Sequence, residues 1–192
     1  MLTFAKRLLI FMLLVFFAGW FLPGDFDAEA ELVIDADRPL IHSYVSDLWT
    51  WPDWTAWRAE DDPECVFTYD DPAGGSKSMS YSWDGPELGT GKLTITSATL
   101  KEGITFDLWF GDETDATHGS ITYSDVEGGV LVTWRLWGDL PGYAGGWFAL
   151  MMDSFATPDF DESLAGLKEA CDKGLEGRLE AGAKEVLEVL GS

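Results

Sequence analysis

The segment from Gly142 to Cys171 constrains the fold more than any other part of the chain. Its large apolar residues recur at a spacing of three and four, which is typical of one face of an α-helix. These residues are Trp147, Met151 and Phe155, followed by Phe160, Leu164, Leu167 and Cys171. A helix with so wide an apolar face needs a large apolar surface to pack against, so we expect a sheet elsewhere in the chain to cover it.

Pro158 divides this segment in two. Thr157 is a suitable N-cap with proline at the first helical position, and Gly174 after Lys173 is typical of a helix end. The sequence therefore predicts a long helix that is kinked or restarts at Pro158 and stops near Gly174. The tail 174–192 has a weaker apolar stripe, which favours a docked amphipathic helix or a frayed end.

Short β-rich runs fill the middle of the chain, separated by glycine, proline and acidic turns. They cover residues 65–69, 77–83, 92–100, 104–110, 120–126 and 130–137, and a first run covers 29–35. Two short helices are predicted between the first two runs, at 38–48 and 52–54. Apolar and polar residues alternate along the runs, which indicates an antiparallel sheet with one apolar face. The predicted fold class is α+β, with a curved seven-stranded antiparallel sheet around the long C-terminal helix.

The N-terminus carries an apolar run from Leu8 to Leu22, preceded by Lys6 and Arg7. We interpret residues 1–24 as one transmembrane helix that anchors the chain through residues 2–22. The alternative is a signal peptide cleaved near Ala28–Ala30. Because positive charge stays on the cytoplasmic side, an anchor would place the rest of the chain on the periplasmic or extracellular side of the cytoplasmic membrane.

The charge balance excludes one class of partner. The chain has 12 Lys plus Arg against 34 Asp plus Glu, a net charge of −22, so nucleic acid would be repelled. With 46% hydrophobic residues the chain is expected to fold. The composition identifies no protein partner.

The reactive side chains are few. Cys65 and Cys171 either form a disulfide in an oxidising compartment or are two buried thiols. His42 and His118 lie outside any zinc-like cluster, and His118, which follows several acidic residues, is expected to be a solvated loop residue. We therefore predict no metal, no cofactor and no catalytic residue from motifs.

Four segments resemble the SRPBCC superfamily, the START-like or helix-grip proteins, and in particular its polyketide cyclase/dehydrase branch. They are residues 32–57, 85–110, 130–141 and 158–171. The resemblance implies a helix-grip domain over 25–173, with a cavity between the sheet and the C-terminal helix and residues 174–192 as a helical tail. Many members also carry one N-terminal hydrophobic anchor. The superfamily includes lipid-transfer, hormone-binding and quinone-binding proteins, polyketide cyclases and chaperone cofactors, so it implies a cavity rather than one reaction.

Inward-facing residues are the candidate cavity wall, or else ordinary core. They are Trp83, Phe106, Leu108, Trp134, Leu136, Trp147, Met151, Met152 and Phe155. Tyr81 is a candidate for orienting a ligand through its hydroxyl. Trp51, Trp54 and Trp57 are expected to plug one end of the sheet or to gate the cavity.

Three functions remain open at this stage. The first is a membrane-tethered protein that binds a hydrophobic small molecule or lipid. The second is a cyclase or dehydratase acting on a polyketide-like substrate, which would need a buried acid or base. The third is a non-catalytic protein-interaction module.

Overall fold

The computed structural model describes residues 2–57, 62–70, 79–111, 114–140, 142 and 144–190. The first elements are α1 (Leu2–Ala18), the 3-10 helix η1 (Gly19–Phe21), β1 (Asp25–Ile34), α2 (Arg38–Val45) and the 3-10 helix η2 (Leu48–Asp53). Six strands follow: β2 (Val66–Tyr69), β3 (Ser80–Gly85), β4 (Gly89–Thr99), β5 (Gly103–Phe110), β6 (Thr117–Val126) and β7 (Gly129–Asp139). The chain ends in α3 (Gly145–Leu190). The predicted fold class is confirmed, although residues 77 and 78 of one predicted strand lie outside the described residues.

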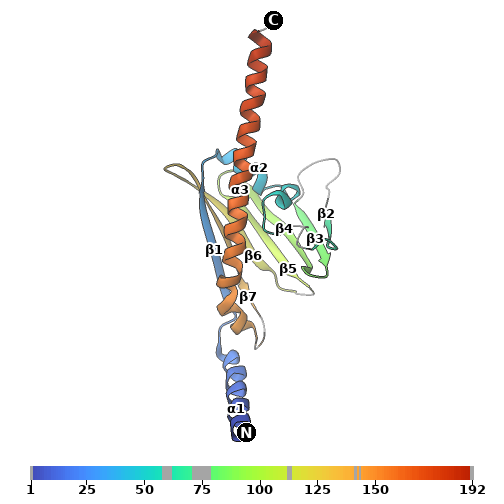
Figure 1. The fold of residues 1–192 in the computed structure, drawn as a ribbon, viewed down its shortest axis with the longest axis vertical. Helices are drawn as coiled ribbons and strands as arrows, with labels where there is room; N and C mark the ends of the chain where they lie inside the picture. The colour runs from blue at the N-terminus through green and yellow to red at the C-terminus, as the bar shows by residue number, and fades with distance from the viewer. Residues whose placement is uncertain are drawn as a thin grey trace.

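The seven strands form one antiparallel sheet in the order β1-β7-β6-β5-β4-β3-β2 (Figure 1). Strand β1 begins at Asp25, four residues before the run predicted over 29–35. The reason is a strict alternation in which acidic residues face outward while Phe26 and Ala28 are buried. Strand β1 pairs with β7 along its whole length. Asp25 pairs with Asp139, so the start of β1 lies beside the end of β7.

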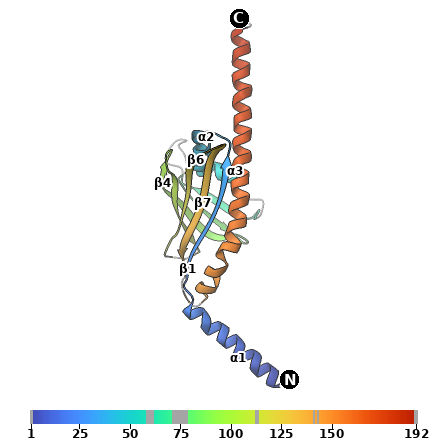
Figure 2. The same ribbon diagram turned by 90° about the vertical axis from the view of Figure 1, so that its left-hand side faces the viewer.

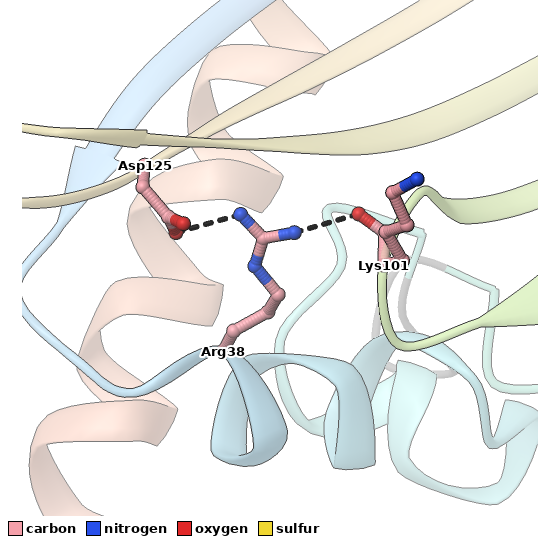
Figure 3. A network of polar contacts seen from close by, with 3 residues as sticks. All are labelled: Arg38, Lys101 and Asp125. Carbon is pink, nitrogen blue, oxygen red and sulfur yellow. Dashed lines mark hydrogen bonds and ion pairs between the residues drawn. The ribbon is translucent and has the colours of Figure 1, made fainter.

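Helix α2 is fixed to the end of the sheet by one arginine (Figure 3). The guanidinium of Arg38 forms a 2.6 Å ion pair with Asp125 of β6 and donates a 2.6 Å hydrogen bond to the Lys101 carbonyl between β4 and β5. Ile41 and Val45, one turn apart, are fully buried. The helix therefore closes one end of the sheet through an apolar face and a polar clamp.

Helix α3 runs beside the sheet and extends well beyond it (Figures 1 and 2). It does not restart at Pro158; instead its first turns run at an angle to the rest (Figure 2), as expected of a proline kink. The predicted stop at Gly174 is wrong. A Cβ there would lie 3.0 Å from the Tyr44 hydroxyl, so this glycine allows close approach of α2 and α3 rather than ending the helix.

The middle of α3 is the part that grips the sheet. Its buried residues are Phe160, Ser163, Leu164, Leu167 and Cys171. Exposed acidic residues, Asp161 and Glu162 among them, occupy the opposite face. The predicted stripe is confirmed here, and the helix contacts β1, β7 and α2.

Two further expectations are settled by the fold. His118 lies on β6 and not in a loop, and its Nδ1 is 2.7 Å from the Asp107 carboxylate on the outer face of the sheet. No disulfide joins Cys65 and Cys171, and Cys171 is buried in the core.

The N-terminal helix leaves the body at the end where β1 begins and α3 starts (Figure 2). The stretch Phe4–Phe21 is long and apolar enough to cross a membrane, a property that an N-terminal signal sequence shares.

Candidate ligand pocket and the aromatic core

An aromatic cluster fills the space between the sheet and α3. Trp134 of β7 lies at its centre and is fully buried. Its indole stacks on Phe160 of α3, with centroids 5.2 Å apart and planes at 7°. Four further rings lie within 6.5 Å of it: Trp51, Trp54, Trp57 and Phe106. Aromatic side chains thus occupy the position in which the resemblance implied a cavity.

The segment after η2 is locked against α3 by short contacts. The Ser163 hydroxyl accepts a 2.9 Å hydrogen bond from the Ala56 amide. A Cβ at Gly166 would lie 2.2 Å from the Trp54 carbonyl oxygen, so only glycine allows this approach. The buried indole of Trp51 donates a 3.1 Å hydrogen bond to the Val45 carbonyl. Trp51 and Trp54 are therefore buried parts of the aromatic core.

A second aromatic group lies farther along the sheet, over β2, β3 and β5. The cross-strand register aligns Phe67, Trp83, Gly91 and Phe110 in one row. The neighbouring row contains Tyr69, Tyr81, Leu93 and Leu108. The Trp83 ring lies over Gly91, where a Cβ would be 2.1 Å from it. The Trp83 ring thus fills the position that a side chain at Gly91 would take, and the aromatic rings of the two rows surround a space beside it.

This space is a pocket with a volume of about 90 Å³. Its lining is almost wholly apolar: Trp57, Phe67, Tyr81, Trp83, Leu88, Leu108 and Phe110. None of these residues comes from α3. Pockets for whole drug-sized ligands measure roughly 300–1,000 Å³. The smaller volume of this pocket suits only part of a ligand, such as one aromatic ring or the end of an acyl chain.

The rim of the pocket is held by a buried carboxylate. Asp62 Oδ2 accepts hydrogen bonds from the amides of Glu87 (2.9 Å) and Leu88 (3.0 Å). The Leu88 carbonyl in turn accepts a 3.3 Å hydrogen bond from the Trp83 indole. The Leu88 amide is the main cause of the lowered pKa of Asp62, because hydrogen-bond donors stabilise the ionised carboxylate. Asp62 therefore positions the turn that carries Leu88.

Tyr81 supplies the ionisable group among the described lining residues. Burial raises the pKa of its phenol above the ordinary value, with smaller contributions from Tyr69 and Cys65. The hydroxyl is therefore protonated at neutral pH and is chemically a hydrogen-bond donor. No acidic or basic side chain joins it among the described lining residues.

The predicted site residues fall into four groups. Tyr81, Trp83 and Leu108 line the pocket, whereas Phe106, Trp134 and Leu136 are buried in the core. Met152 is partly buried against the core. Trp147, Met151 and Phe155 are 37%, 49% and 57% exposed, on the outer side of the first turns of α3.

The sequence did not identify Phe67, Leu88 and Phe110 as lining residues, nor Asp62 as their support, and it suggested Trp57 only as a plug or a gate. Phe110 alternates in step with Phe106 and Leu108, which are among the predicted inward-facing residues, so the alternation was a usable signal for it. Leu88 and Asp62 lie in turns without periodicity, so their roles depend on the tertiary arrangement.

A wider hollow of about 540 Å³ lies between η2 and α3. Its lining includes Asp53, Glu169 and Lys173, and the last two form a 2.8 Å ion pair. This charged lining does not suit an apolar ligand. In the described ranges, no three His, Cys, Asp or Glu side chains are grouped so that they could hold a metal ion.

The chain was compared with known proteins. No protein-family profile and no curated protein matches the sequence. Among solved structures, the di-domain ARO/CYC StfQ of the steffimycin biosynthetic pathway superposes with a TM-score of 0.59 at 11% identity. That match covers 79% of this chain and 52% of StfQ.

Two smaller proteins match over nearly their whole length. The KanY protein has a TM-score of 0.54 at 15% identity, covering 77% of this chain and 98% of KanY. A protein from Chromobacterium violaceum has a TM-score of 0.52 at 12% identity, covering 76% of this chain and 97% of its own. At these identities the likeness is one of fold alone. The chain therefore has a helix-grip-like fold that it shares with a polyketide ARO/CYC protein and with proteins of other names.

Proposed function

We propose that this protein is a membrane-tethered member of the SRPBCC superfamily that binds the apolar end of a small molecule or lipid in the pocket around Leu88 and Leu108. The single observation that carries the proposal is the pocket itself, a space of about 90 Å³ lined by aromatic and leucine side chains. Such linings suit apolar ligands, with one or two polar groups to orient them. In this proposal Tyr81 is the orienting group.

The position of the pocket in the sheet supports membrane tethering. Phe110 is the last residue of β5, and Leu88 lies in the turn from β3 to β4. The antiparallel register puts these positions at the same end of the sheet as the start of β1 and the end of β7. This is also the end from which α1 leaves the body (Figure 2). An anchored domain would thus hold its pocket near the phase in which apolar ligands dissolve.

Tethering implies an arrangement for the whole chain. In this proposal α1 crosses the cytoplasmic membrane with Lys6 and Arg7 inside, and residues 25–173 fold outside it. Helix α3 continues through residues 174–190 as a helical tail. The fold of the structural neighbours supports this domain, while the anchor is supported by the length and apolar character of α1.

A cyclase or dehydratase activity is the second candidate, favoured by the fold shared with StfQ. It requires a general acid or base beside the substrate. Tyr81 is the one ionisable group among the described lining residues, and its raised pKa makes it a weak acid and keeps it from acting as a base at neutral pH. The described pocket therefore supports binding more directly than catalysis, which would need a further acidic or basic group beside the substrate.

Photolabelling in the membrane tests the proposal. The full chain in nanodiscs is irradiated with a neutral medium-chain alcohol that carries a diazirine at the end of its chain, and the labelled peptides are identified by mass spectrometry. We expect labelling of the peptides that contain Leu88 and Phe110, competed by unlabelled alcohol.

Leu88→Trp is the informative variant, because the larger ring would fill the pocket from a partly buried turn position. Leu100→Trp is the matched control, since Leu100 also lies in a turn but is 47% exposed and not part of the lining. Leu88→Trp should reduce labelling severalfold and Leu100→Trp should leave it unchanged. Equal labelling of both variants would contradict the proposed site.

A further inference from the structure

In the first turns of α3 the large apolar side chains point away from the body, which is unusual for a helix that faces water. The side packed against the body is mostly small: Gly145 and Gly146 are buried, and Ala149 and Ala156 are partly buried beside one larger residue, Met152. The outward side carries Trp147, Phe148, Leu150, Met151 and Phe155, each between 37% and 61% exposed. We call these five residues the outer apolar face of α3. A contiguous exposed apolar surface of this kind marks an interaction site.

The same helix shows the usual arrangement one turn later. From Phe160 to Cys171 the large apolar residues are buried, and charged residues such as Asp161 and Asp172 face outward. Between Leu140 and Pro158, in contrast, the sequence contains a single charged residue, Asp153. In a chain with a net charge of −22, so long a stretch with one charge indicates surroundings that are not aqueous.

The outer apolar face continues the apolar surface of the N-terminal helix. Helix α3 contacts η1, and a Cβ at Gly146 would lie 2.5 Å from the Leu22 side chain, so the two segments are in close contact. In η1, Trp20 and Phe21 are 72% and 88% exposed. Figure 2 shows that α1 leaves the body at the start of α3. The end of the membrane-spanning candidate and the outer apolar face therefore lie at one end of the molecule.

From this continuity we infer that the outer apolar face of α3 lies in the interface of the lipid bilayer, beside the point where α1 emerges. Trp20 and Trp147 supply the aromatic rings that favour the headgroup region. The binding is apolar and not electrostatic, because this face lacks the Lys and Arg residues that attract anionic lipids. The inference rests on the membrane anchor in the proposed function and deepens it. The domain would be held against the bilayer at two places, with the pocket end of the sheet facing the membrane.

Fluorescence quenching of single labelled positions tests this seating. Met151→Cys, Asp161→Cys and Phe11→Cys are each labelled with the environment-sensitive fluorophore NBD in the full chain. The chain is held in nanodiscs of phosphatidylcholine and phosphatidylglycerol, and the unsubstituted protein corrects for labelling of Cys65. Met151 and Asp161 are both exposed positions of α3, so neither label disturbs the core. Phe11 lies in α1 and reports whether the anchor is inserted.

We expect doxyl-labelled phosphatidylcholine to quench the label at position 151, and iodide in the water to quench it severalfold less than the label at 161. If iodide quenches both equally while lipid quenches position 11, the seating is overturned and the anchor stands. If lipid quenches neither 11 nor 151, the anchor in the proposed function fails and the seating fails with it. If position 151 is shielded from both quenchers, protein covers the outer apolar face, a second copy of the chain for example, and the inference is overturned.

Discussion

Replacing Gly166 with alanine tests how tightly α3 closes on the core. In an exposed helix, glycine to alanine stabilises the protein by up to about 1 kcal/mol, because glycine loses more backbone freedom on folding. At Gly166 the added methyl would lie 2.2 Å from the Trp54 carbonyl oxygen, which belongs to the backbone and cannot rotate away. Helix and carbonyl would have to separate by about 1 Å, an overpacking that typically costs about 1–3 kcal/mol. We therefore expect a net destabilisation despite the gain in helix propensity.

Gly177→Ala provides a matched control in the same helix. A Cβ at Gly177 meets nothing within 4 Å, so this variant should be neutral or stabilising by up to about 1 kcal/mol. Urea unfolding of the full chain in detergent micelles, followed by tryptophan fluorescence, measures both variants because the tryptophans of the core surround the contact. If Gly166→Ala were as stable as Gly177→Ala, the described closure between α3 and the segment after η2 would be wrong.

Two further predictions follow from the core and from the rim of the pocket. Phe160→Ala should cost about 3–5 kcal/mol in the same unfolding assay, because it removes the ring stacked on Trp134; a loss below about 1 kcal/mol would contradict a filled core. The lowered pKa of Asp62 means that its contribution to stability is full above the unfolded-state pKa of about 3.9 and is lost as pH falls through the folded-state value. Asp62→Asn should therefore lower the unfolding midpoint at pH 7, and the difference from the parent chain should shrink as the pH falls below about 4. A difference that is constant with pH would show that the charge of Asp62 is not involved.

The fold could be predicted from the sequence because the residue patterns that determine it are local. Alternation along the strands fixes which face is apolar, and the spacing of Phe160, Leu164 and Leu167 fixes the buried stripe of α3. All seven strands and both short helical segments are present, with bounds that differ by a few residues. Differences arise where pairing extends a strand, as at Asp25.

The candidate site was only partly predictable because it depends on which apolar surface faces which neighbour. Periodicity shows that Trp147, Met151 and Phe155 share a side of the helix, but it does not show whether that side meets the sheet or points away from the body. In the structure it points outward, and the inner side is formed mainly by Gly145, Gly146 and Ala149, with Met152 beside them. Similarly, Gly174 reads as a helix stop, whereas its role is contact with α2.

The central claim is that an apolar ligand enters the pocket at the anchor end of the sheet and not the space under α3. Its most direct test is a titration with phenol, a single ring with one hydroxyl, of the full chain in nanodiscs with 13C-labelled leucine methyl groups. We predict saturable chemical-shift changes for the methyl groups of Leu88 and Leu108, and none for Leu164, which lies under α3. Unchanged shifts at Leu88 and Leu108, or a larger change at Leu164, would contradict the account.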